Sequence, residues 1–346
     1  MREPPPQPDG ENPSKNPTEP SRPTDPVVKT PAGWSRKLIQ YGGFATAILL
    51  LAGAIYFAAR EGDFSALRDA EAKWVAALLG TMLLSAVLVN GVLFWLVNKP
   101  YADPDRPVRL NDMHALIAGS GLLNYTPVKA GLVGRLAYLK HKHGITYKAS
   151  VLIQLMIGGS MVAAFLSVIL ATAWRERFDT LWWASLALAL PLFAAVGSLL
   201  VQRMLPRRPD PRADAETREA AALRHPLGWT FAHLLFWIVV ALSNVFITGA
   251  RWWFVGKIMD EPLSVRDAVL MSVLHNSTSA LPANGLGARE ALVGLLFGGE
   301  APADFVALAL VDRAAEAMVL VPAGLLSLVY LHRRGMRIRP RTNEPA

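Results

Sequence analysis

Two segments of the chain contain a proline, a glycine and an arginine in the same order and at similar spacing. The first, NYTPVKAGLVGR, ends at Arg135, and the second, TSALPANGLGARE, contains Arg289. In each segment the arginine follows a glycine by about one helical turn. A short helix that begins at this glycine would present unpaired backbone N–H groups beside a guanidinium fork, and both kinds of donor bind phosphate. The sequence therefore predicts two anion-binding sites.

Polar residues and helix breakers around the two arginines extend the predicted sites. The run HNSTS lies shortly before the second proline, and an asparagine holds the corresponding place before the first. We expect the substrate to contact arginines, polar side chains and turn residues from both segments. These are Asn124, Pro127, Gly131, Arg135, His275, Asn276, Pro282, Gly285, Gly287 and Arg289. For Arg135 the alternative is an ordinary anchoring role beside Lys140 and Lys142.

The last apolar run of the chain contains three charged residues. In ALALVDRAAEAMVLVPAGLL, Asp312 and Glu316 share one helix face, and Arg313 is three positions before Glu316. Ionisable groups at membrane depth face the protein interior and pair with one another. Together with Glu290 they are expected to form a charge network that gates transport, or alternatively a purely structural ion network. The corresponding place in the first half holds only Gln154, so the two halves are not equivalent.

These residues lie in a chain that is too apolar for a soluble protein. Of its 346 residues, 52% are hydrophobic and 18% are charged, and the mean hydropathy is +0.29. Runs of about 20 apolar residues, the length that spans a bilayer, recur along the chain. The runs are 38–58, 74–97, 149–174, 181–201, 229–251 and 303–331. The predicted fold is an all-α polytopic membrane protein with about six transmembrane helices.

Neither proline-glycine segment fits inside one of these spans. The apolar stretches before Pro127 and Pro282 are shorter than a bilayer crossing and stop at the proline. Non-helical backbone at membrane depth must be buried in protein or line a wet cavity. We therefore expect two re-entrant helical hairpins that meet inside the bundle. Because three spans separate them, the hairpins should enter from opposite faces, as in an inverted-topology repeat whose binding site lies near the midplane.

Composition divides the chain around this membrane domain. Residues 1–33 are rich in proline and poor in apolar side chains, so they are expected to form a disordered tail. The other predicted parts follow from the spans and the basic stretches. They are the transmembrane domain 34–334, its repeats at about 74–174 and 229–331, a loop at 202–228 and a basic tail at 335–346.

Basic residues indicate the orientation of the chain. Lys and Arg gather in loops that lie on one side if the six spans are correct, and that side should be the cytoplasm. Both termini and the loop 202–228 are therefore expected in the cytoplasm, and the membrane is expected to be a bacterial inner membrane. The net charge of +8 has the same explanation and does not indicate nucleic acid. Arg251 and Lys257, close to Trp252 and Trp253, are expected to anchor the chain at the membrane interface.

Two longer segments resemble the lysylphosphatidylglycerol synthase transmembrane family, also described as flippase-like integral membrane proteins. They are LLNYTPVKAGLVGRLAYLKHKHGITYKASVL and LPANGLGAREALVGLLFGGEAPADFVALALVDRAAEAMVLVPAGLL, and the resemblance covers about 42–334. The residues that match the family pattern are Pro282, Gly285, Gly287, Arg289, Glu290, Arg313 and Gly324. The resemblance implies an all-helical domain that binds lipids and moves them between leaflets. The soluble aminoacyl transferase of two-domain members is not expected here, and Leu132 stands where the family often has Glu.

The expected function is translocation of an anionic or modified phospholipid or polyprenyl lipid by a flippase or scramblase. No metal, cofactor or catalytic residue is expected, because the chain has no cysteine and no recognised nucleotide-binding or nucleophile motif. Two alternatives stay open: an embedded enzyme that modifies lipids through His275, Glu290 and Asp312, and a non-catalytic partner that recruits a soluble enzyme. A membrane phospholipid is the expected partner, and nucleic acid is not. A homo-oligomer and a soluble lipid-modifying enzyme are further candidate partners.

Overall fold

The structure, a computed structural model, describes residues 49, 51–61, 64–126, 129–204, 227–299 and 301–335. These residues form helices joined by turns and loops, and no strand occurs among them. The all-α class predicted from the sequence is thus confirmed for the part of the chain that is described. Three predicted parts lie wholly or mostly outside it: the tail 1–33, the loop 202–228 and the tail 335–346.

Five described helices are long and apolar enough to cross a membrane. The first, Ala72–Tyr101, consists of α2 (Ala72–Leu83), the π-helical turn η2 (Leu84–Val89), α3 (Asn90–Asn98) and the 3-10 turn η3 (Lys99–Tyr101), with η1 (Ser65–Leu67) before it. The others are α6 (Tyr147–Trp174), α7 (Thr180–Met204), α9 (Leu227–Ile258) and α12 (Pro302–Gly335). They match five of the predicted apolar runs. The remaining run, 38–58, lies largely outside the described residues, although residues 51–61 are helical.

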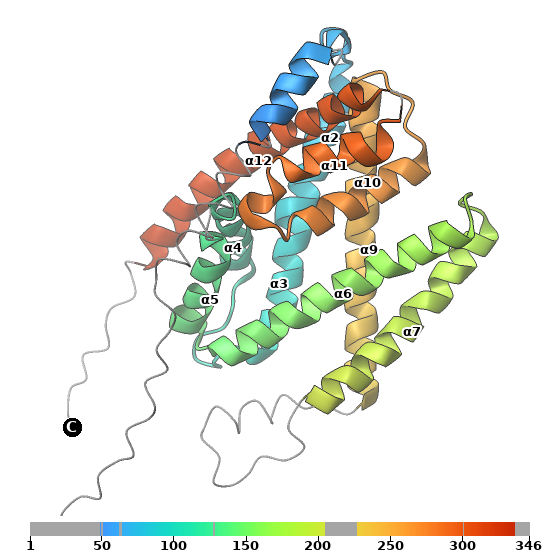
Figure 1. The fold of residues 1–346 in the computed structure, drawn as a ribbon. Helices are drawn as coiled ribbons and strands as arrows, with labels where there is room; N and C mark the ends of the chain where they lie inside the picture. Colours follow the sequence, from blue (N-terminus) through green and yellow to red (C-terminus); the bar gives the residue numbers. More distant parts are fainter. Residues whose placement is uncertain are drawn as a thin grey trace, which may run out of the picture. The chain divides into compact units, whose positions relative to one another are not determined.

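Four shorter α-helices and one 3-10 turn form the two predicted hairpins. α4 (Leu110–Leu123) and α5 (Ala130–His143) belong to the first, and α10 (Val265–Thr278), η4 (Pro282–Gly285) and α11 (Ala288–Phe297) belong to the second. None exceeds 14 residues, so the longest is about 21 Å, too short for a hydrocarbon core of about 30 Å. The spanning helices α6, α7 and α9 separate the hairpins in the sequence (Figure 1). If each of these three helices crosses the membrane once, the hairpins enter from opposite faces, which is the topology that the sequence predicts.

A glycine in each hairpin allows its two helices to approach closely. A Cβ added to Gly131 would lie 1.9 Å from the backbone oxygen of Ser120, near the end of α4. A Cβ added to Gly285 would lie 2.4 Å from the backbone oxygen of Thr278, at the end of α10. Such distances are too short for any side chain. The repeated glycine therefore serves the same packing role in both hairpins.

The last span lies against both hairpins. α12 packs on α4 and on α11, and Figure 1 shows it running past these two helices. Gly324 permits the close approach to α4, because a Cβ added there would lie 2.6 Å from the Cβ of Leu122. A span in this position can join side chains of one hairpin to side chains of the other.

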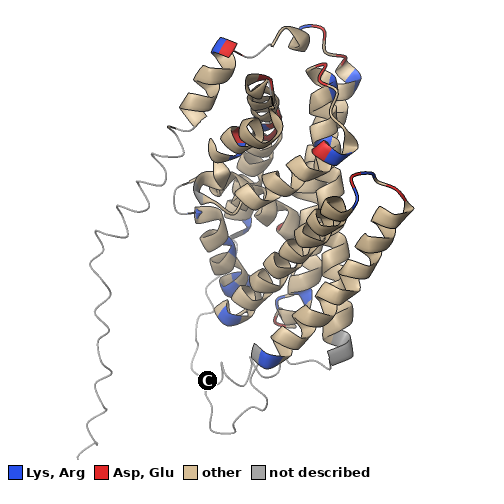
Figure 2. Ribbon diagram, turned by 45° about the vertical axis from the view of Figure 1, so that its right-hand side comes forward, with Lys and Arg blue, Asp and Glu red and all other residues tan. Residues whose placement is uncertain are grey.

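Charged residues lie mainly toward the two ends of the spanning helices. Figure 2 shows Asp and Glu mostly toward one end of the bundle, whereas Lys and Arg lie toward both ends. The loop between α3 and α4 contains Arg106 and Arg109 together with Asp103 and Asp105, and the loop between α9 and α10 contains Asp260 and Glu261.

Single-cysteine variants can test the topology, because the chain has no cysteine of its own. Asp105→Cys lies in an exposed loop before α4, and Glu176→Cys and Asp260→Cys lie in exposed loops after α6 and α9. A membrane-impermeant maleimide added to intact spheroplasts should label positions 176 and 260, and should label position 105 only after permeabilisation. The unsubstituted chain is the control. Labelling of positions 105 and 260 from the same side would contradict the topology.

Candidate functional site

Seven ionisable side chains from four helices meet inside the bundle, and we refer to them as the charge cluster. Each is at most 8% exposed. α9 supplies one arginine, α10 a histidine, α11 an arginine and a glutamate, and α12 the three charged residues predicted at membrane depth. The members are Arg251, His275, Arg289, Glu290, Asp312, Arg313 and Glu316. The structure therefore brings together the whole predicted charge network and adds Arg251, His275 and Arg289 to it.

Asp312 joins three helices to α12. Its carboxylate accepts two hydrogen bonds from Nη2 of Arg251, at 2.9 and 3.1 Å. Nη1 of Arg289 lies 3.3 Å from Oδ2 of Asp312, and Nδ1 of His275 lies 3.5 Å from the same oxygen. One carboxylate on α12 thus contacts side chains from α9, α10 and α11.

Arg289 and Arg313 hold the other two carboxylates. Arg289 donates to Oε2 of Glu316 at 3.2 Å, and its Nε lies 3.6 Å from Oε1 of Glu290. Arg313 donates from Nε to Oε1 of Glu290 at 3.0 Å, and its Nη1 lies 3.5 Å from Glu316. Glu290 is fully buried and lies between the two guanidinium groups. These pairs fix the first turn of α11 against α12.

The charge cluster is electrically balanced. Three arginines contact three carboxylates, so the formal charges sum to zero when His275 is neutral. Removing one partner of a buried ion pair costs about 3–5 kcal/mol, because the other charge stays in a low-dielectric interior. The pairing therefore favours a fixed framework over a site that exchanges ligands.

Three members of the charge cluster also have the ligand types of a metal site. Ligand atoms of His275, Asp312 and Glu316 lie within 4.8 Å of one another. Nη1 of Arg289 lies 3.3 Å from Asp312 and 3.2 Å from Glu316. The same nitrogen contacts Nδ1 of His275. A guanidinium group occupies the position that a bound cation would take, so the geometry favours ion pairing over metal binding.

The turn of the first hairpin reaches the charge cluster through Tyr125. The hydroxyl of Tyr125 donates to Oε1 of Glu316 at 2.8 Å. It accepts a hydrogen bond from Nη1 of Arg313 at 3.1 Å, and the guanidinium carbon of Arg313 lies 5.6 Å from the centroid of the tyrosine ring. One tyrosine therefore connects the first hairpin to both a cation and an anion of α12.

A second contact joins the turns of the two hairpins directly. Nζ of Lys129 donates to the backbone oxygens of Ser279, at 3.1 Å, and Ala280, at 2.6 Å, which follow α10. Lys129 has a φ of 46°, a left-handed conformation that a non-glycine residue keeps only where its surroundings hold it. The hairpins therefore meet at their turns, as predicted. The sequence did not single out Tyr125 or Lys129, whose partners lie at least 150 positions away.

Arg135, on α5, lies in a different electrostatic environment. Its Nη2 donates to Oε1 of Gln154 on α6 at 2.9 Å, and its guanidinium carbon lies 4.4 Å from the ring centroid of Phe94 on α3. Its Nε is buried without a hydrogen-bond partner. Among the residues that the structure describes, no carboxylate oxygen lies within 4 Å of this guanidinium group. Arg135 is therefore a half-buried cation, and no carboxylate among the described residues serves as its counter-ion.

The two halves use the same arrangement with different charges. In the first half an arginine on α5 bonds to Gln154 on α6, and in the second an arginine on α11 bonds to Asp312 and Glu316 on α12. The amide of glutamine accepts a hydrogen bond but does not cancel a charge. The non-equivalence predicted from Gln154 is thus present in the contacts of the two arginines.

The sequence predicts free N–H groups at the start of α5, but two of them donate to side chains of the hairpin. α5 begins at Ala130, whose N–H donates to Oγ1 of Thr126 at 3.1 Å. The N–H of Leu132 donates to Oδ1 of Asn124 at 3.1 Å. The side chain of Asn124 therefore caps the next helix of its own hairpin. Two N–H groups at the start of α5 are therefore already paired within the hairpin.

Four residues in the turn of the second hairpin, between positions 283 and 287, have positive φ. They are Ala283 (49°), Asn284 (57°), Gly285 (67°) and Gly287 (77°). Pro282 opens the 3-10 turn, and no side chain caps α11 at Gly287. Arg313 lies 3.5 Å from the backbone oxygens of Asn284 and Gly285. The predicted turn residues thus shape the approach of α11 to the charge cluster.

Asn276, another predicted site residue, makes its contacts elsewhere. The amide of Asn276 donates to the backbone oxygen of Ser272 at 2.9 Å and accepts from Asn244 on α9 at 3.4 Å. Asn276 therefore joins α10 to α9 and does not contact the charge cluster through these bonds. Pro127 lies outside the described residues.

Arg251 is not the interface anchor that the sequence predicts. It is 4% exposed and pairs with Asp312, and the adjacent Trp252 is fully buried. The prediction was wrong because neighbouring tryptophans and Lys257 are typical of a membrane interface. α9 continues to Ile258, so Arg251 lies about 10 Å before its end. The length of the helix beyond the arginine was the signal that could have placed it in the interior.

Comparison with protein families finds a match over most of the chain. The family model described as the lysylphosphatidylglycerol synthase TM region matches residues 44–324. The matched region contains both hairpins and every member of the charge cluster. No curated protein and no solved structure matches the chain.

Asp312→Ala should lower the free energy of unfolding by about 3–5 kcal/mol, because Arg251 would keep a buried charge without its carboxylate. The loss should appear as a lower apparent Tm of the purified protein in detergent. Arg60→Ala is the control, since Arg60 forms an exposed pair with Glu61, and it should change stability by at most about 1 kcal/mol.

A double variant separates ion pairing from packing. Arg251→Met combined with Asp312→Leu removes both charges of one pair and fills the space with apolar groups. This double variant should be more stable than Asp312→Ala alone, because no charge on α9 is left unpaired. An apparent Tm equal to or below that of Asp312→Ala would contradict the assignment of the pair.

Proposed function

We propose, because this chain belongs to the family described as the lysylphosphatidylglycerol synthase TM region, that it moves a lipid with an anionic headgroup between the leaflets of a bacterial inner membrane. The family consists of membrane proteins that handle lipids, and the five apolar helices agree with a multi-pass protein. The proposed activity is that of a flippase or scramblase, with both termini in the cytoplasm. The observation that carries the proposal is the uncompensated guanidinium group of Arg135.

A cation at this depth needs a negative partner. Gln154 and Phe94 give Arg135 one hydrogen bond and one ring face, but neither carries a negative charge. A buried charge is costly unless it is paired. A phosphate oxygen can supply the missing charge, and its geometry accepts two parallel N–H groups from a guanidinium fork. An anionic headgroup therefore fits this position better than a neutral one.

We assign a positioning role to the charge cluster. The charge of Arg289 is already balanced by Asp312, Glu316 and Glu290, so it has less to gain from a lipid phosphate. Tyr125 and Lys129 connect this balanced framework to the hairpin that carries Arg135. In this proposal the second half holds the two hairpins in register, and the first half contacts the headgroup.

The contacts of the candidate acid and base residues favour transport over a chemical reaction. His275, Glu290 and Asp312 each contact at least one arginine. A proton transfer through any of them would break a buried ion pair or hydrogen bond to an arginine. The proposed function therefore requires no catalytic residue, cofactor or metal.

Arg135→Gln should slow the translocation of fluorescent phosphatidylglycerol by about ten- to a hundredfold, because a hydrogen bond to a charged group contributes roughly 1.5–3 kcal/mol. The rate is measured in sealed proteoliposomes as the loss of outer-leaflet fluorescence after dithionite addition. Lys140→Gln is the matched control, since it removes the same charge from an exposed position of the same helix. Equal rates for wild type and Arg135→Gln, or equal losses in both variants, would contradict the site.

Leu132→Glu should weaken the preference for anionic lipids. Leu132 is half-buried and lies three residues before Arg135, so a carboxylate there can pair with the guanidinium group on the same helix face. The ratio of phosphatidylglycerol to phosphatidylcholine translocation should fall toward one. Leu132→Gln, which is similar in size but uncharged, should keep the wild-type ratio. A wild-type ratio in Leu132→Glu would argue against a charge-based site at Arg135.

A further inference from the structure

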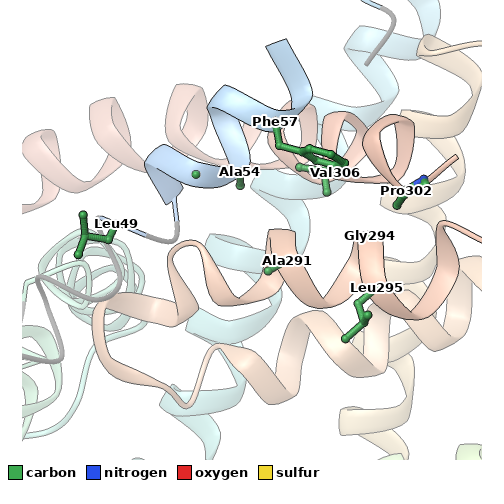
Figure 3. Close-up of a pocket in the computed structure, with 9 residues that line it drawn as sticks. Leu49, Ala54, Phe57, Ala291, Gly294, Leu295, Pro302 and Val306 are labelled. Carbon is green, nitrogen blue, oxygen red and sulfur yellow. The ribbon is translucent and has the colours of Figure 1, made fainter. Parts of the chain in front are cut away.

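An apolar pocket lies on the other side of α11 from the residues discussed so far. Its volume is about 400 Å³, and it opens between Leu49, residues 51–57, α11 and α12 (Figure 3). Glycine, alanine, proline and larger apolar residues form the whole lining. We propose that this pocket binds one acyl chain of a membrane phospholipid. This is a claim about binding, and it does not depend on the transport activity proposed above.

The residues at the rim show which molecule is available to fill the pocket. Leu49 is 71% exposed, Leu295 is 77% exposed and Phe57 is 39% exposed. On the outer surface of a membrane bundle such side chains contact lipid, because water is absent from the hydrocarbon core. An apolar cavity also does not hold water stably. The occupant that matches both the lining and the surroundings is a hydrocarbon chain.

Small residues create the space. Gly294 brings α11 close to α12, since a Cβ added there would lie 2.5 Å from Cγ2 of Val306 and 3.1 Å from the backbone oxygen of Pro302. Gly53 has the opposite surroundings, because no heavy atom lies within 4 Å of an added Cβ. A side chain at position 53 would therefore start in open space at the edge of the pocket. A helix also tolerates this change, since most residues are better helix formers than glycine.

α11 links the pocket to the charge cluster. Its first turn carries Arg289 and Glu290, and the next residue, Ala291, already lines the pocket. Leu295, at the rim, lies about 9 Å further along the helix than Arg289. A lipid whose chain enters the pocket is thus held beside the helix that the charge cluster fixes.

The test is photolabelling of the full-length protein in nanodiscs with a phosphatidylglycerol that carries a diazirine near the end of one acyl chain. Peptides that contain Phe57 and Leu295 should be labelled in the wild type. Gly53→Trp should reduce this labelling about fivefold or more, because the indole takes the place of several methylene groups. Gly159→Trp is the matched control: Gly159 is an exposed helical glycine with the same open surroundings, outside the pocket.

A second blocking variant keeps the result independent of position 53. Leu49→Trp places an indole at the exposed rim and should also reduce labelling. Equal labelling of the wild type and both variants would mean that lipid touches only the outer surface, and this would overturn the proposal. Absence of label from these peptides, or cross-links there to a second copy of the chain, would overturn it as well. Because labelling measures binding alone, a wild type that fails to transport lipid leaves this result readable.

Discussion

A charged side chain inside a membrane bundle must have a partner of opposite charge, and the arrangement of this protein depends on that requirement. Three arginines and three carboxylates from α9, α11 and α12 compensate one another, with His275 of α10 against them. Each pair is favourable only with both partners in place. The pairs therefore fix the second hairpin against the last span. Tyr125 and Lys129 extend the same framework to the turn of the first hairpin.

The two hairpins share an architecture but differ in their charge balance. In the second, carboxylates of α12 neutralise Arg289; in the first, the partner of Arg135 is an uncharged glutamine. An inverted repeat brings two equivalent positions toward the middle of a membrane bundle. Here one position has become a rigid ion network and the other keeps an unbalanced cation. The second half is thus balanced in charge, and the first half keeps a cation that no described carboxylate balances.

The spans and hairpins could be predicted because hydropathy and helix breakers are local properties of a sequence. Asp312, Arg313 and Glu316 were placed in one network because spacing along a helix sets which residues share a face, and Glu290 was added as a partner from the second hairpin. Arg251 was misplaced, since the tryptophans beside it are also typical of an interface. Tyr125, Lys129 and the capping role of Asn124 depend on how segments fold back on one another. No local pattern encodes those contacts.

The most direct test of the uncompensated cation is the identity of the lipids that stay with the purified protein. Native mass spectrometry of wild type and Arg135→Gln, extracted from the same membranes, would measure the bound anionic and zwitterionic phospholipids. We predict that wild type retains mainly anionic phospholipid, since it supplies the charge that Gln154 lacks. Arg135→Gln should lose this preference while it stays folded. The same lipid composition in both proteins would contradict the account.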